Sequence, residues 1–429
     1  MLDIQNLYSL YTACRRVSTD TRKIIPGSIF FALKGPNFNA NAFAEEAINK
    51  GAKYAVIDEE QYKKGDNYFL VEDVLTALQK LANHHRHQLK IPFIGITGSN
   101  GKTTTKELVN AVLSKKYKTL ATAGNLNNQI GVPLTLLSID ESIEIAIIEM
   151  GASKVGDIQE LCDIAEPTHG MITNIGKAHI EGFGGFEGVI LGKSELYLSL
   201  LKNAGQVFIN SQNPILNNMG KRFRNPLYYP AKGDFLHCEF ISASPYIIYK
   251  SEGGKVIETN LLGSYNFENI CAALCIGKFF DVSPDLANEA VKNYVPANNR
   301  SQLLKKGSNL LILDAYNANP NSMRAAIQNL KLMDADKKTV VLGDMYELGH
   351  VSEEEHRGIG ELLKECNFNH VLLYGKAMIA AQKAFHPAEH FIDKEELKNR
   401  IRELNLQNNL VLIKASRSLG LESIVEDLN

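Results

Sequence analysis

The sequence predicts an α/β protein of three domains: a small α/β domain over residues 1–91, a central parallel-sheet domain over 92–297, and a Rossmann-like domain over 298–429. Three observations support this. A chain of 429 residues is long enough for two or three hydrophobic cores. Ile91-Pro92 interrupts a helical pattern, because a residue before proline disfavours the helical conformation. From there on, apolar strand-like segments alternate with helical ones, as in parallel sheets covered by helices.

The first domain is expected to contain strands at Ile29–Leu33 and Tyr54–Ile57, with a helix at Ala42–Lys50 between them. A polar helix follows at Val74–Leu89 and ends with His84, His85 and His87. Adjacent histidines cannot share one helix face, so we interpret them as part of a solvated surface rather than a metal site.

The central domain is expected to place its strands at Ile91–Ile96, Glu144–Met150, His169–Ile175 and Gly205–Asn210. Phe235–Leu262 is predicted to form antiparallel hairpins. The C-terminal domain repeats a strand followed by a helix, with strands at Leu310–Asp314, Thr339–Leu342, His370–Tyr374 and Leu410–Lys414. Polar loops follow three of them, at Asp314–Pro320, Gly343–Gly349 and Ala415–Arg417. Ligands of open α/β sheets bind at this end of the strands.

The segment Gly95–Thr104, Gly-Ile-Thr-Gly-Ser-Asn-Gly-Lys-Thr-Thr, lies between a predicted strand and a predicted helix. Glycine-rich turns let main-chain N–H groups and the helix N-terminus converge on a phosphate. Lys102 is then expected to reach the terminal phosphates and Thr103 to bind Mg²⁺. The usual pattern has its first glycine at the position of Ile96, so the match is imperfect, and a glycine-rich turn with an incidental lysine is the alternative. We therefore expect a P-loop ATPase-like central domain.

The composition of the chain limits the kinds of binding partner that we expect. The net charge of −2 gives no electrostatic reason to expect nucleic acid or an anionic membrane. No apolar run approaches the length of a membrane span and no signal peptide is visible, which favours a cytoplasmic protein without membrane insertion. The six cysteines are scattered, and Cys271 and Cys275 are expected to be packed core thiols.

Further candidate residues follow the central strands. Glu149 ends one strand, where P-loop enzymes commonly hold Mg²⁺, although a surface carboxylate is the alternative. His179 follows the next strand and is a candidate metal or phosphate contact. Lys193 lies in an apparent helix and, from its residue type alone, is expected to be solvated. The loop Asn125–Pro133 contains asparagines that bind a ligand or satisfy the loop backbone.

Taken in order, the motifs resemble the Mur ligases of peptidoglycan synthesis over essentially the whole chain. They are Gly-x-Thr-Gly-Ser-Asn-Gly-Lys-Thr-Thr-Thr-Lys, Asn-x-Asn-Asn-x-Ile-Gly-Val-Pro, Glu-Met-Gly and Thr-Asn-Ile-Gly-x-Ala-His. Asp-Ala-Tyr-Asn-Ala-Asn-Pro from Asp314, Gly-Asp-Met-Tyr-Glu-Leu-Gly from Gly343 and Lys-Ala-Ser-Arg-Ser from Lys414 are similar to the branch that adds a dipeptide.

The resemblance implies ATP and two Mg²⁺ ions as cofactors. It implies nucleotide contacts at Gly98, Ser99, Asn100, Gly101, Lys102, Thr103, Thr104, Asn266, Arg300, Asp314 and Asn317. It implies metal binding at Thr103, Glu149, His179 and a carbamylated Lys193, and catalytic roles for Lys102, Lys193, His179 and Arg300. Domain closure is expected to hinge near residues 298–300.

Substrate contacts are implied at Ser18, Asp20, Thr21, Arg22, Lys34 and Gly35 for a uridine nucleotide, and at Asn127, Asn128, Lys414, Ser416 and Arg417. Two stretches depart from the family pattern. Pro36–Asn41 replaces a common Asp-Gly, and Ala415 replaces a glycine. The first affects contacts to the UDP-sugar, and the second lies near the expected dipeptide site.

The implied reaction is the ATP-dependent joining of D-alanyl-D-alanine to UDP-N-acetylmuramoyl-tripeptide through an acyl phosphate, by a monomeric enzyme. Three alternatives are a sibling ligase that adds the third amino acid, a folylpolyglutamate synthase and a non-catalytic nucleotide switch. The sibling usually carries Asp-Asn-Pro-Arg, which is missing here. A folylpolyglutamate synthase would not need an N-terminal domain that binds a uridine nucleotide. A non-catalytic nucleotide switch would not need the full set of candidate metal ligands.

Overall fold

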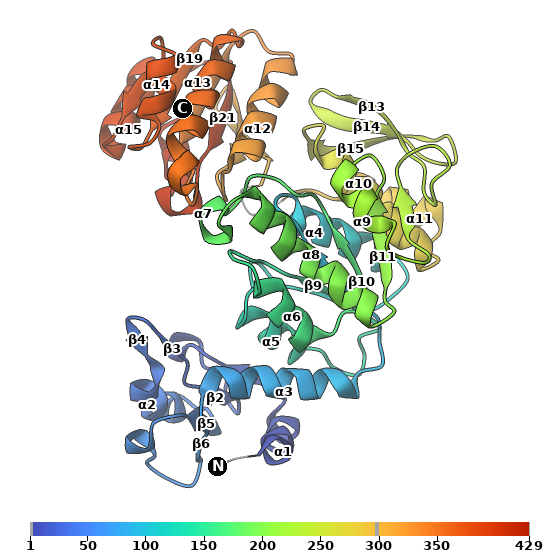
Figure 1. Ribbon diagram of the computed structural model, residues 1–429. Helices are drawn as coiled ribbons and strands as arrows, with labels where there is room; N and C mark the ends of the chain where they lie inside the picture. Colours follow the sequence, from blue (N-terminus) through green and yellow to red (C-terminus); the bar gives the residue numbers. More distant parts are fainter. Residues whose placement is uncertain (1–2, 297–299, 429) are drawn as a thin grey trace.

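The computed structural model describes residues 3–296 and 300–428. Three sheet-containing units follow one another along the chain, from the N-terminal unit at the bottom of Figure 1 through the central unit to the C-terminal unit at the top. The sheets fall within the three predicted domain ranges. Asn298 and Asn299 of the expected hinge lie outside the described residues, and the domain limits stay a prediction.

The N-terminal unit is a small parallel sheet with helices. Among the described residues its strand order is β1-β2-β5-β6, formed by β1 (Val17–Ser18), β2 (Ile29–Phe31), β5 (Tyr54–Ile57) and β6 (Tyr68–Leu70). The helices are α1 (Ile4–Cys14), α2 (Ala44–Asn49) and α3 (Val74–Gln88). A short hairpin of β3 (Lys34–Gly35) and β4 (Phe38–Asn39) projects beside the sheet.

Helix α3 packs against the central unit. One of its three histidines is buried there, although we expected all three to be solvated. His85 is only 6% exposed, and its Nε2 lies 2.9 Å from the carbonyl oxygen of Ile139. Arg86 donates from Nε to Ala165 O at 2.9 Å and stacks over the Phe93 ring. The prediction of a solvated face is therefore wrong for His85, because α3 packs against the central unit on that side.

The central sheet is parallel throughout, with the order β12-β11-β10-β7-β9-β8 in the described part of the chain. Its strands are β7 (Phe93–Thr97), β8 (Thr119–Ala121), β9 (Ile145–Glu149), β10 (His169–Ile172), β11 (Gln206–Asn210) and β12 (Leu227–Tyr229). The chain first builds β8 and β9 on one side of β7 and then β10 to β12 on the other. The carboxyl end of β7 is thus a topological switch point, the usual place for a ligand in such sheets.

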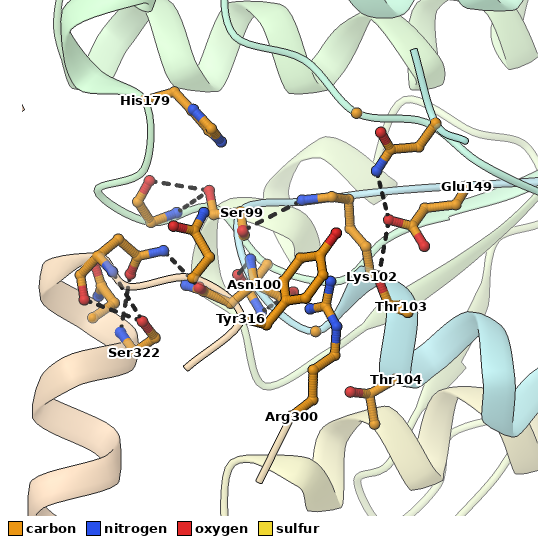
Figure 2. A pocket seen from close by; sticks show the side chains of 18 of the residues that line it. Ser99, Asn100, Lys102, Thr103, Thr104, Glu149, His179, Arg300, Tyr316 and Ser322 are labelled. Carbon is orange, nitrogen blue, oxygen red and sulfur yellow. Dashed lines mark hydrogen bonds between the residues drawn. The ribbon is translucent and has the colours of Figure 1, made fainter. Parts of the chain in front are cut away.

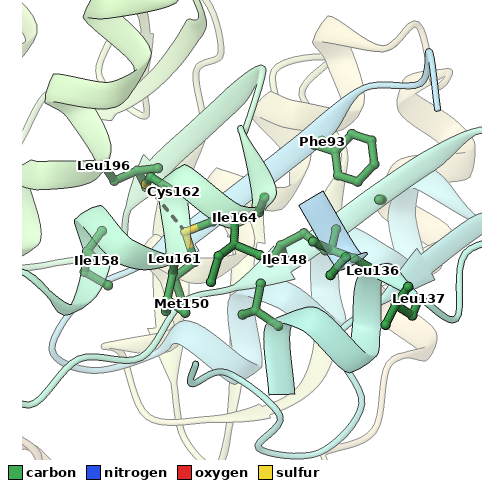
Figure 3. Packing of buried hydrophobic residues seen from close by; sticks show 14 of the residues in the cluster. Phe93, Leu136, Leu137, Ile148, Met150, Ile158, Leu161, Cys162, Ile164 and Leu196 are labelled. Carbon is green, nitrogen blue, oxygen red and sulfur yellow. Dashed lines mark hydrogen bonds between the residues drawn. The ribbon is translucent and has the colours of Figure 1, made fainter. Parts of the chain in front are cut away.

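This sheet is covered by helices α4 (Lys102–Leu113), α5 (Gly131–Leu136), α6 (Asp157–Ala165), α8 (Phe186–Lys202) and α9 (Pro214–Gly220). The short helix α7 (Ile180–Phe183) packs against α8. Figure 3 shows the apolar side chains of α5 and α6 packed on Phe93 and Ile148 of the neighbouring strands β7 and β9. These side chains are almost fully buried, so the strands that end at the switch point have a rigid support.

The predicted hairpins are present as an antiparallel sheet of β13 (Glu239–Ala243), β14 (Tyr246–Lys250) and β15 (Val256–Leu262). Helices α10 (Asn266–Phe279) and α11 (Pro284–Asn293) follow. Cys271 and Cys275 of α10 are fully buried free thiols, as expected. No helix in residues 3–296 and 300–428 is long and apolar enough to cross a membrane.

The C-terminal sheet has the order β16-β17-β21-β18-β19-β20 over its described residues, and only β16 runs antiparallel to its neighbour. Its strands are β16 (Gln302–Lys306), β17 (Asn309–Asp314), β18 (Lys338–Gly343), β19 (His370–Tyr374), β20 (Glu389–Phe391) and β21 (Leu410–Lys414). The helices are α12 (Pro320–Leu332), α13 (Ser352–Lys364), α14 (Ile379–Ala384) and α15 (Lys394–Leu404). The carboxyl ends of β17, β18 and β21 carry the three predicted polar loops.

Candidate active site

A cavity of about 740 Å³ lies between the Gly95–Thr104 loop and the C-terminal unit. Figure 2 shows side chains from both units directed into it, among them Lys102, Arg300 and Tyr316. The predicted nucleotide and metal residues that line it are Ser99, Asn100, Gly101, Lys102, Thr103, Thr104, Glu149, His179, Asn266, Arg300, Asp314 and Asn317. Asn127, Asn128 and Lys414 of the predicted substrate set line it as well.

The loop after β7 depends on its glycines. Gly98 and Gly101 have φ of 144° and 78°, in the region that side chains rarely adopt. A Cβ at Gly98 would lie 1.9 Å from Thr173 Oγ1, and one at Gly101 would lie 2.7 Å from Asn269 Oδ1. The loop can therefore pack against β10 and α10 only with glycine at these positions. Helix α4 starts directly after it and directs its free N–H groups toward the cavity.

Lys102 is folded back on the loop. Its Nζ donates to the carbonyl oxygens of Gly98 at 2.7 Å and Ser99 at 3.4 Å. Burial lowers the pKa of Lys102, Arg300 lowers it further, and Glu149 opposes this shift. An anion bound in the cavity would raise the pKa of Lys102 again, because its negative charge favours the protonated amine.

Glu149 ends β9 with a buried carboxylate. Its Oε1 accepts hydrogen bonds from Thr103 Oγ1 at 3.1 Å and Asn127 Nδ2 at 2.8 Å. Its Oε2 is buried and has no hydrogen-bond partner among the described residues. A buried carboxylate oxygen without a donor fits a cation, and a hydroxyl and a carboxylate are ligands that Mg²⁺ accepts.

No cluster of three His, Cys, Asp or Glu side chains with metal-binding geometry occurs within the described ranges. Thr103 and Glu149 are joined directly, whereas His179 lies across the cavity from them in Figure 2.

Lys193 lies on α8 and is only 1% exposed, so the expectation of a solvated lysine from its residue type alone is wrong. Its Nζ lies 3.4 Å from Ala152 O and 5.2 Å from the centre of the Phe183 ring. Burial, together with Lys102, holds the pKa of Lys193 well below its usual value. The amine is therefore neutral more readily than a surface lysine, and a neutral amine is the form that reacts with CO₂.

His179 immediately precedes α7 in a left-handed conformation, with φ of 54°. Its Nδ1 lies 2.5 Å from Oε2 of Glu347, in the loop after β18. The two atoms form a close polar contact whose angle is not that of a hydrogen bond. The neighbouring His179 lowers the pKa of Glu347 despite its partial burial.

The side chains at the strand ends of the C-terminal unit are mostly paired with one another. Lys414 is 2% exposed, and its Nζ donates to Asp314 Oδ2 at 2.6 Å and to Asn317 O at 3.1 Å. The other Asp314 oxygen accepts from the N–H of Ser301. The buried Lys414 thus stabilises the loops after β17 and β21, whatever contact it also makes with a substrate.

Arg300 behaves differently. Its guanidinium stacks over the Tyr316 ring at 3.7 Å from the ring centre, and its buried Nε has no hydrogen-bond partner in the described part of the chain. The exposed Arg417 lies over the same ring at 4.8 Å. Two cations on one aromatic ring repel each other, so this pair is suited to an anionic ligand.

Two predicted substrate residues make local contacts in this structure. Ser416 is 3% exposed, and its Oγ accepts from the N–H of Tyr346 at 2.9 Å. Asn128 Oδ1 accepts from the N–H groups of Ile130 and Gly131 at the start of α5. Asn266 is also internally bonded, to Leu262 O. These contacts shape the cavity walls.

The predicted uridine-binding residues lie on the N-terminal unit, away from the cavity. Asp20 accepts hydrogen bonds from Arg22, which lower its pKa to about 2. Ser18 Oγ lies 3.0 Å from Ser28 Oγ, and Lys34 pairs with Asp58 at 3.0 Å. Thr21 O accepts from Lys50, and Gly35 is exposed on its hairpin. The sequence predicts these residues within the N-terminal unit. In the structure they lie at or after the carboxyl ends of the parallel strands β1 and β2.

The atypical Pro36–Asn41 stretch forms a closed network. Asn39 Oδ1 accepts from Asn41, while Asn41 exchanges hydrogen bonds with Asp58. Asn39 Nδ2 also donates to Glu59 at 2.9 Å. The two asparagines therefore hold a fixed turn beside Lys34.

Several lining residues were not predicted as site residues. Asn319 Nδ2 donates to Asn100 Oδ1 at 2.7 Å, and Asn174 Oδ1 accepts from the N–H of Asn100. Asn269 contacts the Thr105 hydroxyl, and Tyr316 stacks on Arg300. Asn174, Asn319 and Tyr316 stand inside the motifs that carry the resemblance, which is the signal that would have found them.

Comparison with known proteins agrees with this geometry. Residues 96–277 match the Mur ligase middle domain, and residues 299–417 match the Mur ligase, glutamate ligase domain. The UDP-N-acetylmuramoyl-tripeptide--D-alanyl-D-alanine ligase of Bacillus subtilis is 37% identical, over 97% of this chain and 93% of its own length.

Solved structures are similar over the same extent. MurF from Acinetobacter baumannii superposes with a TM-score of 0.87 at 30% identity, covering 98% of this chain and 97% of its own. MurF ligase from Thermotoga maritima, in complex with ADP, gives a TM-score of 0.86 at 28% identity and covers 100% of this chain and 98% of its own. This chain therefore belongs to the Mur ligase family and, within it, to the UDP-N-acetylmuramoyl-tripeptide--D-alanyl-D-alanine ligases.

Proposed function

We propose that this chain uses ATP to join D-alanyl-D-alanine to UDP-N-acetylmuramoyl-tripeptide, releasing ADP and phosphate in peptidoglycan precursor synthesis. One observation carries the assignment of the reaction to this cavity. The Gly95–Thr104 loop faces the strand ends of a second unit across a cavity of about 740 Å³. Both sides present a cation that has no carboxylate partner among the described residues, Lys102 and Arg300. Such a cavity suits a triphosphate and the carboxylate that accepts its γ-phosphoryl group.

The chemistry follows from the poor leaving group of a carboxylate. A carboxylate oxygen of the tripeptide attacks the γ-phosphorus, the bond to the bridging oxygen breaks, and ADP leaves. The dipeptide amine then attacks the acyl carbon, phosphate leaves, and the amine gives up a proton. Lys102 and Arg300 stabilise the charge that develops on the transferred phosphoryl group. Enclosure between two units keeps water from the acyl phosphate.

Mg²⁺ would be held by Thr103 and Glu149, whose unpartnered oxygen fits a cation. His179 and a carbamylated Lys193 are the proposed ligands of a second ion. When bound, Mg²⁺ supplies Lewis-acid stabilisation of phosphoryl oxygens. The depressed pKa of Lys193 supports the carbamate, because a neutral amine adds to CO₂ and releases one proton.

The remaining site roles are proposals of the same kind. The Ser18–Arg22 segment and the Lys34-Gly35 hairpin would bind the uridine nucleotide, and Arg417 with Tyr316 would face the dipeptide carboxylate. Because one chain supplies every wall of the cavity, we propose a monomer, acting in the cytoplasm where its nucleotide substrates are made. We also propose domain limits at 91/92 and 297/298.

The test is phosphate release from ATP and Mg²⁺, with UDP-N-acetylmuramoyl-tripeptide and D-alanyl-D-alanine added singly and then together. We expect release only with both, and a product heavier than the tripeptide substrate by the dipeptide less water. Turnover without either substrate would indicate a nucleotide switch. Turnover supported by a free amino acid in place of the dipeptide would indicate the sibling ligase.

A further inference from the structure

The loop after β18, Gly343–Gly349, extends from the C-terminal unit to the segment that carries His179. Glu347 contacts that segment twice: its Oε2 lies 2.5 Å from His179 Nδ1, and its carbonyl oxygen accepts from the N–H of Glu181 at 3.2 Å. We propose that Glu347 is a positioning residue that orients the His179 imidazole toward a divalent cation, so that this part of the metal site is complete only when the C-terminal unit is docked. This inference rests on the proposed function.

The chemistry of a metal-bound imidazole supports this role. A histidine binds a metal through the lone pair of one ring nitrogen, and the proton then resides on the other nitrogen, where a carboxylate commonly accepts it. Glu347 stands at Nδ1, which leaves Nε2 for the metal. Figure 2 shows the His179 ring directed into the cavity.

Backbone conformation supports the pairing independently. His179 and Glu347 have φ of 54° and 62°, and they are two of only nine non-glycine residues with positive φ in the described part of the chain. A left-handed conformation is unfavourable for such residues unless the surroundings enforce it, and it often marks a functional constraint. Here the two residues in this conformation come from different units and face each other.

The Gly343–Gly349 loop is fixed before it reaches His179. The N–H of Met345 donates to Nε2 of the buried His356 at 3.0 Å, and the N–H of Tyr346 donates to Ser416 Oγ at 2.9 Å. The N–H of Asp344 donates to Tyr374 O. Three successive main-chain donors are thus occupied, so Glu347 is held in place by the C-terminal unit rather than by His179.

Helix α7 is equally confined. A Cβ at Gly182 would lie 2.2 Å from Ser153 O, and one at Gly349 would lie 3.3 Å from the Glu181 side chain. Main chain therefore packs closely on both sides of the segment after His179. The close packing at Gly182 and Gly349 couples the position of this segment to that of the C-terminal loop.

A second polar contact between the same units provides the control. Lys177 Nζ donates to Glu355 at 2.6 Å, and neither side chain lines the nucleotide cavity. Lys177→Gln removes an ion pair that holds the units together without touching His179. If Glu347 acts only in docking, the two losses must have the same consequences.

The experiment measures Mn²⁺ binding to the full chain by electron paramagnetic resonance, with a non-hydrolysable ATP analogue and UDP-N-acetylmuramoyl-tripeptide present. Ligation activity of the unchanged protein is measured first, because its absence would refute the proposed function itself. We expect Glu347→Ala to weaken one class of bound Mn²⁺ by about 10- to 100-fold, the usual effect of losing such a partner. Glu347→Gln keeps an oxygen acceptor and should lose less.

We expect Glu347→Ala to lower kcat while leaving the KM for the UDP-substrate unchanged, and Lys177→Gln to leave Mn²⁺ affinity unchanged. Glu347→Gln carries the test if Glu347→Ala fails to fold, which circular dichroism will show. The inference is overturned if both Glu347 variants bind Mn²⁺ like the unchanged protein. It is also overturned if Lys177→Gln weakens Mn²⁺ binding to the same extent.

Discussion

The two walls of the cavity use buried charge in opposite ways. On the central wall, Lys102 donates to main-chain oxygens of its own loop, and one oxygen of Glu149 has no partner among the described residues. On the C-terminal wall, Lys414 is held between Asp314 and the carbonyl oxygen of Asn317. Lys102 and Glu149 are available to a ligand, whereas the charges of Lys414 and Asp314 fix loops of the C-terminal unit.

This difference separates chemistry from architecture. A buried charge without a partner is unfavourable and persists where a ligand supplies the partner, so such groups concentrate at functional sites. A buried pair contributes little net stability, but breaking it is strongly destabilising. Mutation of Lys102 or Glu149 should therefore change turnover, whereas mutation of the Lys414–Asp314 pair should change folding stability.

Replacing Lys102 should have the largest effect. We expect Lys102→Met to lower kcat by about 10³-fold or more, because it removes a charge that acts mainly on the transferring phosphoryl group. The measurement is ligation rate at saturating substrates, together with thermal unfolding. Stability should change little, since the group that is lost carries a pKa lowered by burial and therefore opposes folding.

The matched control is Lys106, one turn further along α4. It is 1% exposed, and its Nζ donates to Thr122 O at 2.6 Å. We expect Lys106→Met to lower the free energy of unfolding by about 1–3 kcal/mol through the unsatisfied carbonyl, with kcat of the folded protein retained. Equal losses of kcat in both variants would contradict the contrast.

Lys193 should follow in size of effect. Lys193→Ala removes a proposed metal-binding carboxylate, so we expect a loss of about 10³-fold in kcat, in line with several kcal/mol of metal-assisted stabilisation. Formate or acetate should restore part of the activity by occupying the space. Carbon NMR after labelling with isotopic bicarbonate should show a carbamate in the unchanged protein and none in the variant. A fully active variant would place Lys193 outside the machinery.

Breaking the pair on the C-terminal wall should act on stability. We expect Asp314→Asn to lower the free energy of unfolding by about 3 kcal/mol, because it leaves the Lys414 ammonium buried without its countercharge. The double variant Asp314→Asn with Lys414→Met should recover part of this loss, since no charge then remains. Denaturant unfolding of the single and double variants gives the comparison, and equal stability of all of them would contradict it.

Local sequence signals account for much of the fold. The strand β9 was predicted near its observed bounds, because burial on both faces of a parallel sheet leaves a continuous apolar run in the sequence. The loop after β7 was predicted from its glycines and its Lys-Thr pair. The short strands β8, β12 and β16 were not predicted, since all of their residues except the buried Tyr229 are partly buried or exposed. Their strand character depends on the neighbouring strand rather than on their own pattern.

The site shows the same limit. Gly98, Lys102 and Thr103 were evident because one segment carries the whole phosphate loop. The burial of Lys193 had no local signal, because packing of α8 against distant segments creates it. Glu347 and His179 are 168 residues apart in the sequence, and only the docking of two units brings them together.

The smallest predicted effect tests the bond that joins the two walls. Asn319 has two roles: its Oδ1 caps α12 by accepting from the N–H of Ser322, and its Nδ2 donates to Asn100 of the phosphate loop, 219 residues away in sequence. Asn319→Ser should preserve the cap, because serine caps helices about as well as asparagine. We expect unchanged thermal stability but a KM for ATP raised by about 5-fold, equivalent to about 1 kcal/mol for one hydrogen bond. Asn319→Ala should show the same KM and also lose about 1 kcal/mol of stability with the cap. If Asn319→Ser leaves the KM unchanged, the contact between the walls contributes nothing to nucleotide binding.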